Sequence, residues 1–364
     1  MKQVGLILRK AGLLAAVYLV MFLIVFYSKE LSEGIKGGIH TSLNLLLPSM
    51  LIFLIFSNAL MASGLAPLTA SPFRFLSNRI FRIPENEIVI VVLSLVGGYP
   101  VGAKLLSDGV KEGRILPETA SRMLAYCVNC GPAFLISGVG VGIFRSLRLG
   151  VMIYLSQIAA CILIGGLSGI GRRDCKISHK KQFSSPVPQG GSVILVNAVT
   201  DAIRSMAIIC GFVVAFSAFL PVISSLLSKL PAEIGYFLRG LLEVTTGCAN
   251  LSLFENYDPV LLAALFTGFG GICVHLQVCA MLKGSGVSMK RFYLWRIPYI
   301  AFSMLSLKGM LMLFPGITQT LGIRHDIKNQ VFSVSPAATF FLVLLCIMLL
   351  FFRGKSATLK KRNQ

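Results

Sequence analysis

Long runs of apolar residues dominate the chain and set its fold class. Several reach the roughly 20 residues that a helix needs to cross the hydrocarbon core of a bilayer. The runs and the polar stretches between them predict an all-α polytopic membrane protein. About eight transmembrane helices are expected, near residues 11–27, 41–62, 123–144, 149–170, 193–221, 259–282, 297–314 and 336–352.

Two further stretches, 88–106 and 234–256, are interrupted before they reach a full crossing. In the first, "IVIVVLSL" gives way to "VGGYPVGAKLL", where glycines, a proline and a lysine come together. The second, "IGYFLRGLLEVTTGCANLSLFEN", is semi-apolar and ends in small polar residues. Backbone groups freed at such a break are tolerated at membrane depth only where they are buried in protein or line a wet cavity. Both stretches are therefore predicted to be re-entrant hairpins, which enter the membrane and return to the same side.

The two interrupted stretches fall at equivalent places in two halves of the chain. Each half continues with a glycine-rich segment, "NCGPAFLISGVGVGIF" in the first and "TGFGGICVHLQ" in the second. The first half starts outside and the second inside, which predicts an inverted repeat, an arrangement that marks the substrate sites of many transporters. The expected organisation is an N-terminal helix and connector (1–40), a first repeat (41–170), a basic linker (171–192), a second repeat (193–315) and a C-terminal helix with a basic tail (316–364).

Composition and charge agree with a membrane protein. Hydrophobic residues make up 55% of the chain and charged residues only 13%, far from the balance of soluble domains. The net charge of +20 lies in blocks beside the apolar runs, so no nucleic-acid partner is expected. The blocks that would share a side with the N-terminus hold 20 Lys and Arg against 8 on the other side. The positive-inside rule then predicts that both termini are cytoplasmic.

Signatures of an enzyme or an ATP-driven pump are missing from the sequence. It contains no G-x-x-x-x-G-K-[ST] motif, no H-E-x-x-H motif and no recognisable nucleophile arrangement. The "CVNC" pair at Cys127 and Cys130 has neither a second pair nor nearby His ligands, so no metal site is expected. The basic N-terminal start lacks a cleavage site and predicts an uncleaved first helix. We expect neither enzymatic activity nor a cofactor.

Candidate solute-binding residues in the first half lie at its break. Glycines let the backbone approach a ligand, and Pro100 fixes the bend. Lys104 follows the break and can face an anionic solute, so Lys104→Ala is expected to abolish solute accumulation; the alternative is that its ammonium group snorkels to the interface. The candidates in this half are Gly97, Gly98, Tyr99, Pro100, Gly102, Lys104, Asn129 and Gly131.

In the second half the candidates gather around Glu243. With the neighbouring threonines it forms a cluster able to bind a cation or a polar ligand, although an ion pair with Arg239, four residues earlier, is the alternative. Asn129 and Gln277 occupy matching places in the two halves, and paired amides suit a planar polar ligand. The candidates in this half are Glu243, Thr245, Thr246, Asn250, Gly271 and Gln277.

Four motifs in order resemble the sporulation integral membrane proteins of the YlbJ type, which carry the nucleoside-recognition or Gate domain. They are "GGYPVGAKLLSDGVKEGRI", "NCGPAFLISGVGVGIF", "EVTTGC" and "FGGICVHLQ", and the resemblance covers about residues 40–315. It implies a multi-pass protein of the bacterial cell membrane, acting at the outer forespore membrane. Gate domains are also similar to parts of concentrative nucleoside transporters, in which two re-entrant hairpins hold the substrate.

Three functions remain open on these grounds. The leading hypothesis is a secondary transporter or facilitator of a small organic anion; the resemblance implies dipicolinate, moved from the mother cell toward the forespore. The alternatives are a nucleoside or nucleobase transporter, and a membrane scaffold in spore assembly whose glycine-rich breaks only permit close helix packing. The expected partners are the solute and the lipid bilayer. Neither the coupling ion nor the oligomeric state follows from the sequence.

Overall fold

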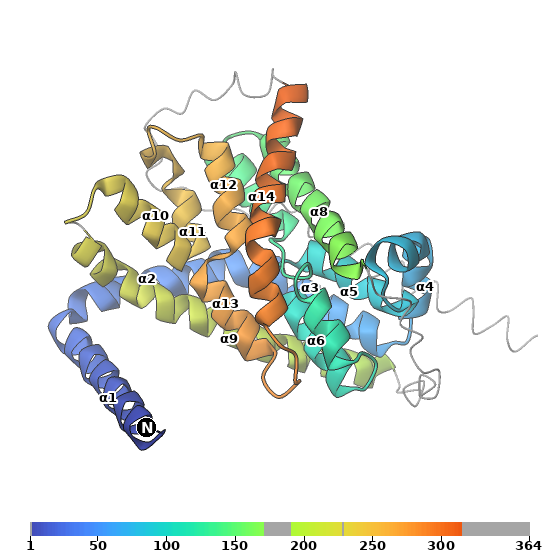
Figure 1. Ribbon diagram of the computed structural model, residues 1–364, viewed down its shortest axis with the longest axis horizontal. Helices are drawn as coiled ribbons and strands as arrows, with labels where there is room; N and C mark the ends of the chain where they lie inside the picture. The colour runs from blue at the N-terminus through green and yellow to red at the C-terminus, as the bar shows by residue number, and fades with distance from the viewer. Residues whose placement is uncertain (1, 171–190, 228, 315–364) are drawn as a thin grey trace, which may run out of the picture.

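A computed structural model describes residues 2–170, 191–227 and 229–314 of the chain. Over these residues the protein is built from helices and connecting turns, with no strand among them (Figure 1). The predicted crossing at 336–352, nearly all of the 171–192 linker and the tail lie outside the described residues.

The N-terminal arm consists of two helices that meet almost at a right angle. Helix α1 (Lys2–Phe26) extends away from the other helices and bends by 91° into α2 (Ser28–Thr41) (Figure 1). The predicted connector, up to residue 40, is thus largely helical. Gly34 and Gly38 let this polar helix approach the backbone of α9 (Gly191–Leu227) closely.

The rest of the first half consists of short helical elements and ends in one long helix. The chain continues directly from α2 into the π-helix η1, so the predicted crossing at 41–62 has no separate start. The elements are η1 (Ser42–Leu46), α3 (Leu47–Ala62), α4 (Ala66–Ala70), η2 (Ser71–Phe73), η3 (Leu76–Phe81), η4 (Glu85–Glu87), α5 (Ile88–Gly97), α6 (Val101–Lys111), α7 (Pro117–Met123), η5 (Ala133–Ile143) and α8 (Leu147–Gly169).

One predicted crossing, at 123–144, is not a continuous helix. Helix α7 ends at Met123, and the π-helix η5 starts only at Ala133. The residues between them include a non-helical stretch that is almost completely buried, with exposures of 0–2% from Leu124 to Cys130. This half therefore contains a second interruption that apolar length alone does not reveal.

The second half begins with α9 and has its own interruptions. The helices after α9 are interrupted by a single residue at two places, Glu243 and Gly270. The elements are α10 (Ala232–Leu242), α11 (Val244–Ala249), η6 (Leu251–Leu253), α12 (Pro259–Phe269), α13 (Gly271–Met281) and α14 (Lys290–Leu313).

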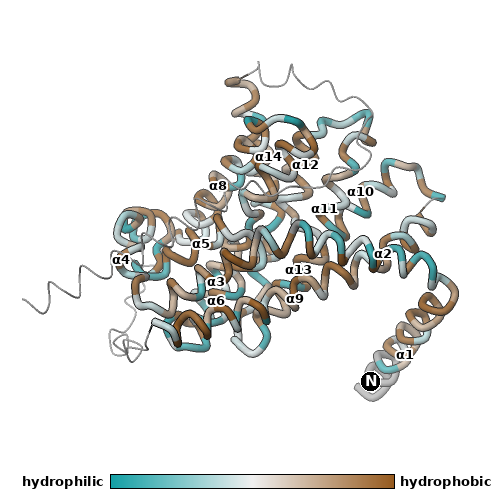
Figure 2. Tube along the Cα trace, turned by 180° about the vertical axis from the view of Figure 1, so that it is seen from behind, coloured by the Kyte–Doolittle hydropathy of each residue, from teal (hydrophilic) through white to brown (hydrophobic). Residues whose placement is uncertain are grey.

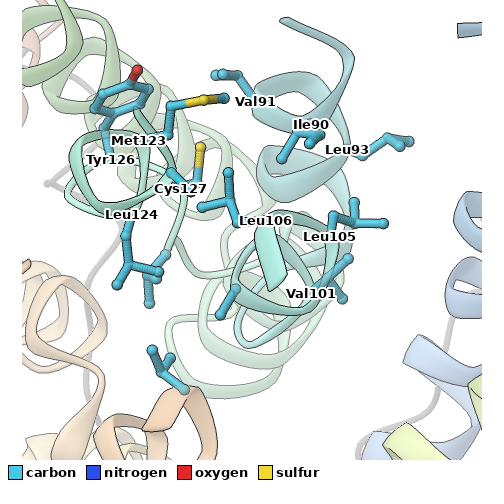
Figure 3. Packing of buried hydrophobic residues seen from close by; sticks show 14 of the residues in the cluster. Ile90, Val91, Leu93, Val101, Leu105, Leu106, Met123, Leu124, Tyr126 and Cys127 are labelled. Carbon is cyan, nitrogen blue, oxygen red and sulfur yellow. The ribbon is translucent and has the colours of Figure 1, made fainter. Parts of the chain in front are cut away.

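Helices α5 and α6 form the predicted hairpin at 88–106, and its apolar residues are buried in the protein rather than left for lipid. Figure 3 shows side chains from both helices together with those of the stretch after α7. All ten labelled residues are at most 5% exposed. They are Ile90, Val91 and Leu93 of α5, Val101, Leu105 and Leu106 of α6, and Met123, Leu124, Tyr126 and Cys127.

A buried ion pair closes the base of this hairpin. Glu87, just before α5, is 2% exposed, and its Oε2 lies 3.5 Å from Nη1 of Arg114, which follows α6. Arg114 also contacts Glu112 at 2.6 Å. Burial raises the pKa of Glu87 to about 7, although the positive charge of Arg114 opposes that rise.

Three helical segments are long and apolar enough to cross a membrane: α8, α9 and the α12–α13 pair, Pro259–Met281. The number rises to five if the bent pairs α1–α2 and α3–α4 each count as one span. These figures concern the described residues only and fall short of the predicted eight. Figure 2 shows α1 and α9 as largely hydrophobic, and many of their large apolar side chains are exposed.

Candidate functional site

The two predicted breaks, far apart in the sequence, line a single cavity. Its volume is about 80 Å³. Apolar residues of α3, α9 and α13 complete the wall. Seven of the fourteen predicted site residues line it: Gly97, Gly98, Tyr99, Gly131, Glu243, Thr245 and Gln277.

At the first break, backbone touches backbone. Helix α5 ends at Gly97, and Gly98 has a φ of +73°, a conformation that favours glycine. A Cβ atom placed on Gly98 would lie 2.6 Å from the backbone nitrogen of Gly131. The hairpin and the segment that leads into η5 can therefore approach this closely only because both residues lack side chains.

At the second break, a carboxylate takes the place of the missing helical hydrogen bonds. Glu243 is extended, with φ −141° and ψ 119°, and is 5% exposed. Its Oε1 accepts from the backbone N–H and hydroxyl of Thr245 at 2.9 and 2.7 Å, and its Oε2 accepts from the same groups of Thr246 at 2.7 and 2.8 Å. Glu243 is thus the N-cap of α11, and its negative charge lies beside N–H groups that would otherwise lack partners.

A glycine packs against each break in the same way. Gly271, the first residue of α13, has a φ of +74°. A Cβ atom there would lie 3.0 Å from the Leu242 oxygen and 3.1 Å from the Val244 nitrogen. Gly131 and Gly271 therefore have equivalent roles, each at the start of the segment that packs against the break.

Lys104 does not line the cavity. Its ammonium group lies 2.7 Å from Oδ2 of Asp108, one helical turn further along α6, and donates to Oδ1 of Asn58 at 3.1 Å. Asn58 in turn donates to the Ala198 carbonyl of α9. The lysine side chain is 12% exposed. It therefore joins three helices instead of presenting its charge to a solute in the cavity.

The other predicted residues outside the lining have contacts in the surrounding helices. Pro100 precedes α6, and Gly102 packs against the Cys127 carbonyl. Asn129 donates to the Tyr126 carbonyl at 2.8 Å, so the structure does not bring it together with Gln277. Thr246 bonds the Glu243 carboxylate, and Asn250 ends α11 by donating to the Thr246 carbonyl.

Glu243 does not form an ion pair with Arg239, which was its alternative role. Arg239 donates to the Gly235 carbonyl and to the Ser224 hydroxyl, and its guanidinium lies 4.5 Å from the centre of the Tyr236 ring. The Glu243 carboxylate is held by the two threonines. Arg239 therefore fixes α10 to α9, while Glu243 serves the break.

Sequence reasoning missed two side chains that connect the halves. Gln157 of α8 accepts from the Cys130 N–H at 3.2 Å and donates to Thr267 at 2.9 Å. Arg296 of α14 donates to the Val128 and Phe269 carbonyls at 2.8 and 3.2 Å. Arg296 directly precedes the predicted crossing at 297–314, but it is 3% exposed and lies inside a helix. A lone arginine in an apolar segment was the signal available.

The cysteines of the predicted "CVNC" pair have different surroundings. Cys130 lines the cavity, as does Cys273 from the second half, whereas Cys127 lies in the core shown in Figure 3. Within the described part of the chain, no group of three or more His, Cys, Asp or Glu side chains is placed to hold a metal ion.

Comparison with known proteins gives one clear relationship. The chain is 23% identical over 303 residues to the sporulation integral membrane protein YlbJ of Bacillus subtilis (strain 168), a match that covers 73% of this chain and 74% of YlbJ. No family model matches, and no solved structure matches. The similarity and the apolar helices agree with the motifs read from the sequence. The chain is therefore an integral membrane protein related to the YlbJ type of sporulation proteins.

Proposed function

We propose that this protein is a secondary transporter or facilitator that carries a small organic anion across a membrane during sporulation. The observation that carries the proposal is the shared cavity, into which the break at Gly98 and the break at Glu243 both project backbone and polar groups. Interrupted helices that meet at one cavity are the usual construction of solute sites in transporters.

The proposal includes an inverted repeat of two Gate-like halves with eight crossings and two re-entrant hairpins. The equivalent placement of Gly131 and Gly271 against the two breaks supports it. The proposed location is the outer forespore membrane, with both termini in the cytoplasm and transport directed toward the forespore.

Dipicolinate is the first solute to test, because the relative that the chain matches is a sporulation protein. A nucleoside or nucleobase is the second candidate, favoured by a specific observation. The cavity lining includes a carboxylate, an amide and a phenol, from Glu243, Gln277 and Tyr99. These groups suit a neutral planar ring with several hydrogen-bonding positions.

The test is the dipicolinate content of spores from a strain that lacks the protein, with dipicolinate synthesis in the mother cell measured in parallel. We expect normal synthesis and empty spores, with filling restored by the unaltered gene. Gln277→Leu should fail to restore filling, since Gln277 lines the cavity. Asn256→Ala, a change in an exposed amide bonded to Glu233, serves as the control and should restore it.

Two results would redirect the proposal. Spores that fill normally without the protein would remove dipicolinate, and nucleoside uptake would be measured next. Full complementation by Gln277→Leu and by Tyr99→Ala would mean that the cavity is not used, as expected for a membrane scaffold.

A further inference from the structure

Arg296 is a buried cation held by groups that carry no formal charge. Its Nη1 and Nε donate to backbone carbonyls, and its guanidinium lies 5.1 Å from the ring centres of Phe292 and Tyr299. Among the described residues no carboxylate lies within ion-pair distance of it. A buried charge is costly without compensation, and here only carbonyl dipoles and ring faces compensate it.

One amino group of this arginine is still available. Nη2 makes no hydrogen bond with the described part of the chain, whereas Nη1 and Nε do. It lies 3.4 Å from the position that a Cβ atom would take on Gly270. Because Gly270 has no side chain, none is placed against Nη2 from that position.

Arg296 stands directly behind the cavity wall. The carbonyl that Nη1 holds belongs to Val128, two residues before the cavity-lining Cys130. Gly270, next to Nη2, is joined to Gly271, which packs on the cavity-lining Glu243. The guanidinium therefore holds a carbonyl two residues from a lining residue in the first half, and its Nη2 lies beside the glycine that precedes Gly271 in the second. The field of a charge buried in protein is screened less than that of a charge in water.

The other charged groups near the cavity already have hydrogen-bond partners. The Glu243 carboxylate receives four hydrogen bonds from Thr245 and Thr246, and Lys104 is paired with Asp108. Helix α13, eleven residues long, begins at Gly271 beside the cavity and adds the positive end of its dipole. Glu243 therefore adds a negative charge whose two oxygens are already occupied, whereas Arg296 adds a positive charge with one nitrogen, Nη2, that no described residue engages.

From this arrangement we propose that Arg296 supplies the positive charge that lets the cavity hold an anion. The inference rests on the proposed transport of an organic anion and names the residue that selects for it. Arg296 thus has the anion-binding role that the sequence analysis gave to Lys104. It also binds a backbone carbonyl at one interruption in each half.

The experiment measures how well small molecules bind to the purified full-length protein in lipid vesicles. The readout is the reactivity of the protein's own cysteines. Cys130 and Cys273 line the cavity and are 2% and 1% exposed, so the rate at which N-ethylmaleimide alkylates them reports on the cavity. The probes are dipicolinate and pyridine-2,6-dicarboxamide, a neutral molecule of the same shape. Wild-type protein should be protected by dipicolinate at a concentration at least about tenfold lower than that of the diamide.

Three variants separate charge from structure. Arg296→Gln should lose the preference for the anion, and Arg296→Lys should retain part of it because the charge stays. Arg122→Gln is the matched control: Arg122 is also a buried arginine, 2% exposed, that donates to two backbone carbonyls, those of Phe81 and Arg82. The carbonyls that Arg122 holds are not close in the chain to any lining residue, so this variant should keep the preference whatever it does to stability.

The inference is overturned if wild-type protein protects its cysteines equally with both probes, a result that needs no variant to fold. It is also overturned if Arg296→Gln inserts normally and keeps the preference. Dipicolinate flux into the same vesicles tests the transporter proposal separately. An Arg296-dependent preference without flux would refute transport alone, whereas flux that Arg296→Gln leaves unchanged would refute only the role of Arg296.

Discussion

At the break between α5 and α6 two backbones meet without side chains, whereas at the break between α10 and α11 a side chain completes the backbone's hydrogen bonds. The first depends on Gly98 and Gly131 and contributes shape. The second depends on Glu243 and contributes a charge that its own helix end stabilises. The carboxylate of the first hairpin lies instead at its base, as Glu87. The first break thus depends on the absence of side chains and the second on the presence of one. Substitutions at corresponding positions of the two breaks should therefore have different effects.

The largest effect is expected at the glycine contact. Gly98→Ala places a Cβ atom 2.6 Å from the Gly131 nitrogen and strains a residue at φ +73°, which should cost about 3–5 kcal/mol or prevent insertion. Gly113→Ala is the control, because Gly113 has a φ of +72° with nothing within 4 Å of the Cβ position. Thermal unfolding in detergent should separate the two variants; equal losses would show that conformation, not contact, governs the first break.

The base of the first hairpin should give the protein a pH dependence. Since the pKa of Glu87 is about 7 in the folded protein against an ordinary 4.5, the folded state keeps a proton that the unfolded chain has released between these values. Stability should therefore fall as pH rises from about 4.5 to about 7, by up to about 3 kcal/mol, and then level off. Glu87→Gln should flatten that part of the unfolding profile. An unchanged slope in the variant would assign it to another group.

Removing the carboxylate at the second break should cost less than crowding the first. Glu243→Ala leaves two backbone N–H groups and two hydroxyls without their acceptor, a loss of about 2 kcal/mol. Asp258→Ala removes a comparable cap, which accepts from Val260 and Leu261 at the start of α12. Both should lower the unfolding temperature, but only Glu243→Ala should change the alkylation rate of Cys130 and Cys273. Similar alkylation in the two variants would place Glu243 outside the solute site.

The smallest effect is expected at Lys104. Lys104→Met removes a partly exposed ion pair with Asp108, which should change stability by less than about 1 kcal/mol. Protection by dipicolinate should change less than about twofold, in contrast to Arg296→Gln. A complete loss of protection in Lys104→Met would return the anion-binding role to the first hairpin.

The sequence located both breaks because glycine, proline and small polar residues interrupt apolar runs there, a local signal. The interruption between α7 and η5 has no such signal for most of its length. The partners of its backbone groups come from elsewhere in the chain, since Gln157 accepts from the Cys130 N–H and Arg296 holds the Val128 carbonyl. Apolar length therefore suggested a continuous crossing where long-range hydrogen bonds maintain a gap.

The same limit explains two other differences. The stretch 28–39 has too many charges to be recognised as a packed helix; it packs on α9 through its glycines and through Leu31. Arg296 looked like a flanking charge because the apolar run was taken to start at residue 297, whereas α14 begins at Lys290. In both cases the residues that pack against the segment lie far away in the sequence.

Helix α9 lines the cavity and is also longer than the hydrocarbon core of a bilayer is thick. Its 37 residues extend about 55 Å at 1.5 Å per residue, well beyond a hydrocarbon core of about 30 Å. A helix of this length must tilt steeply or emerge from the core, and its tilt follows the local thickness. Because Ile209 and Val213 of α9 form part of the cavity wall, we expect the shape of the cavity to depend on the lipid composition of the membrane.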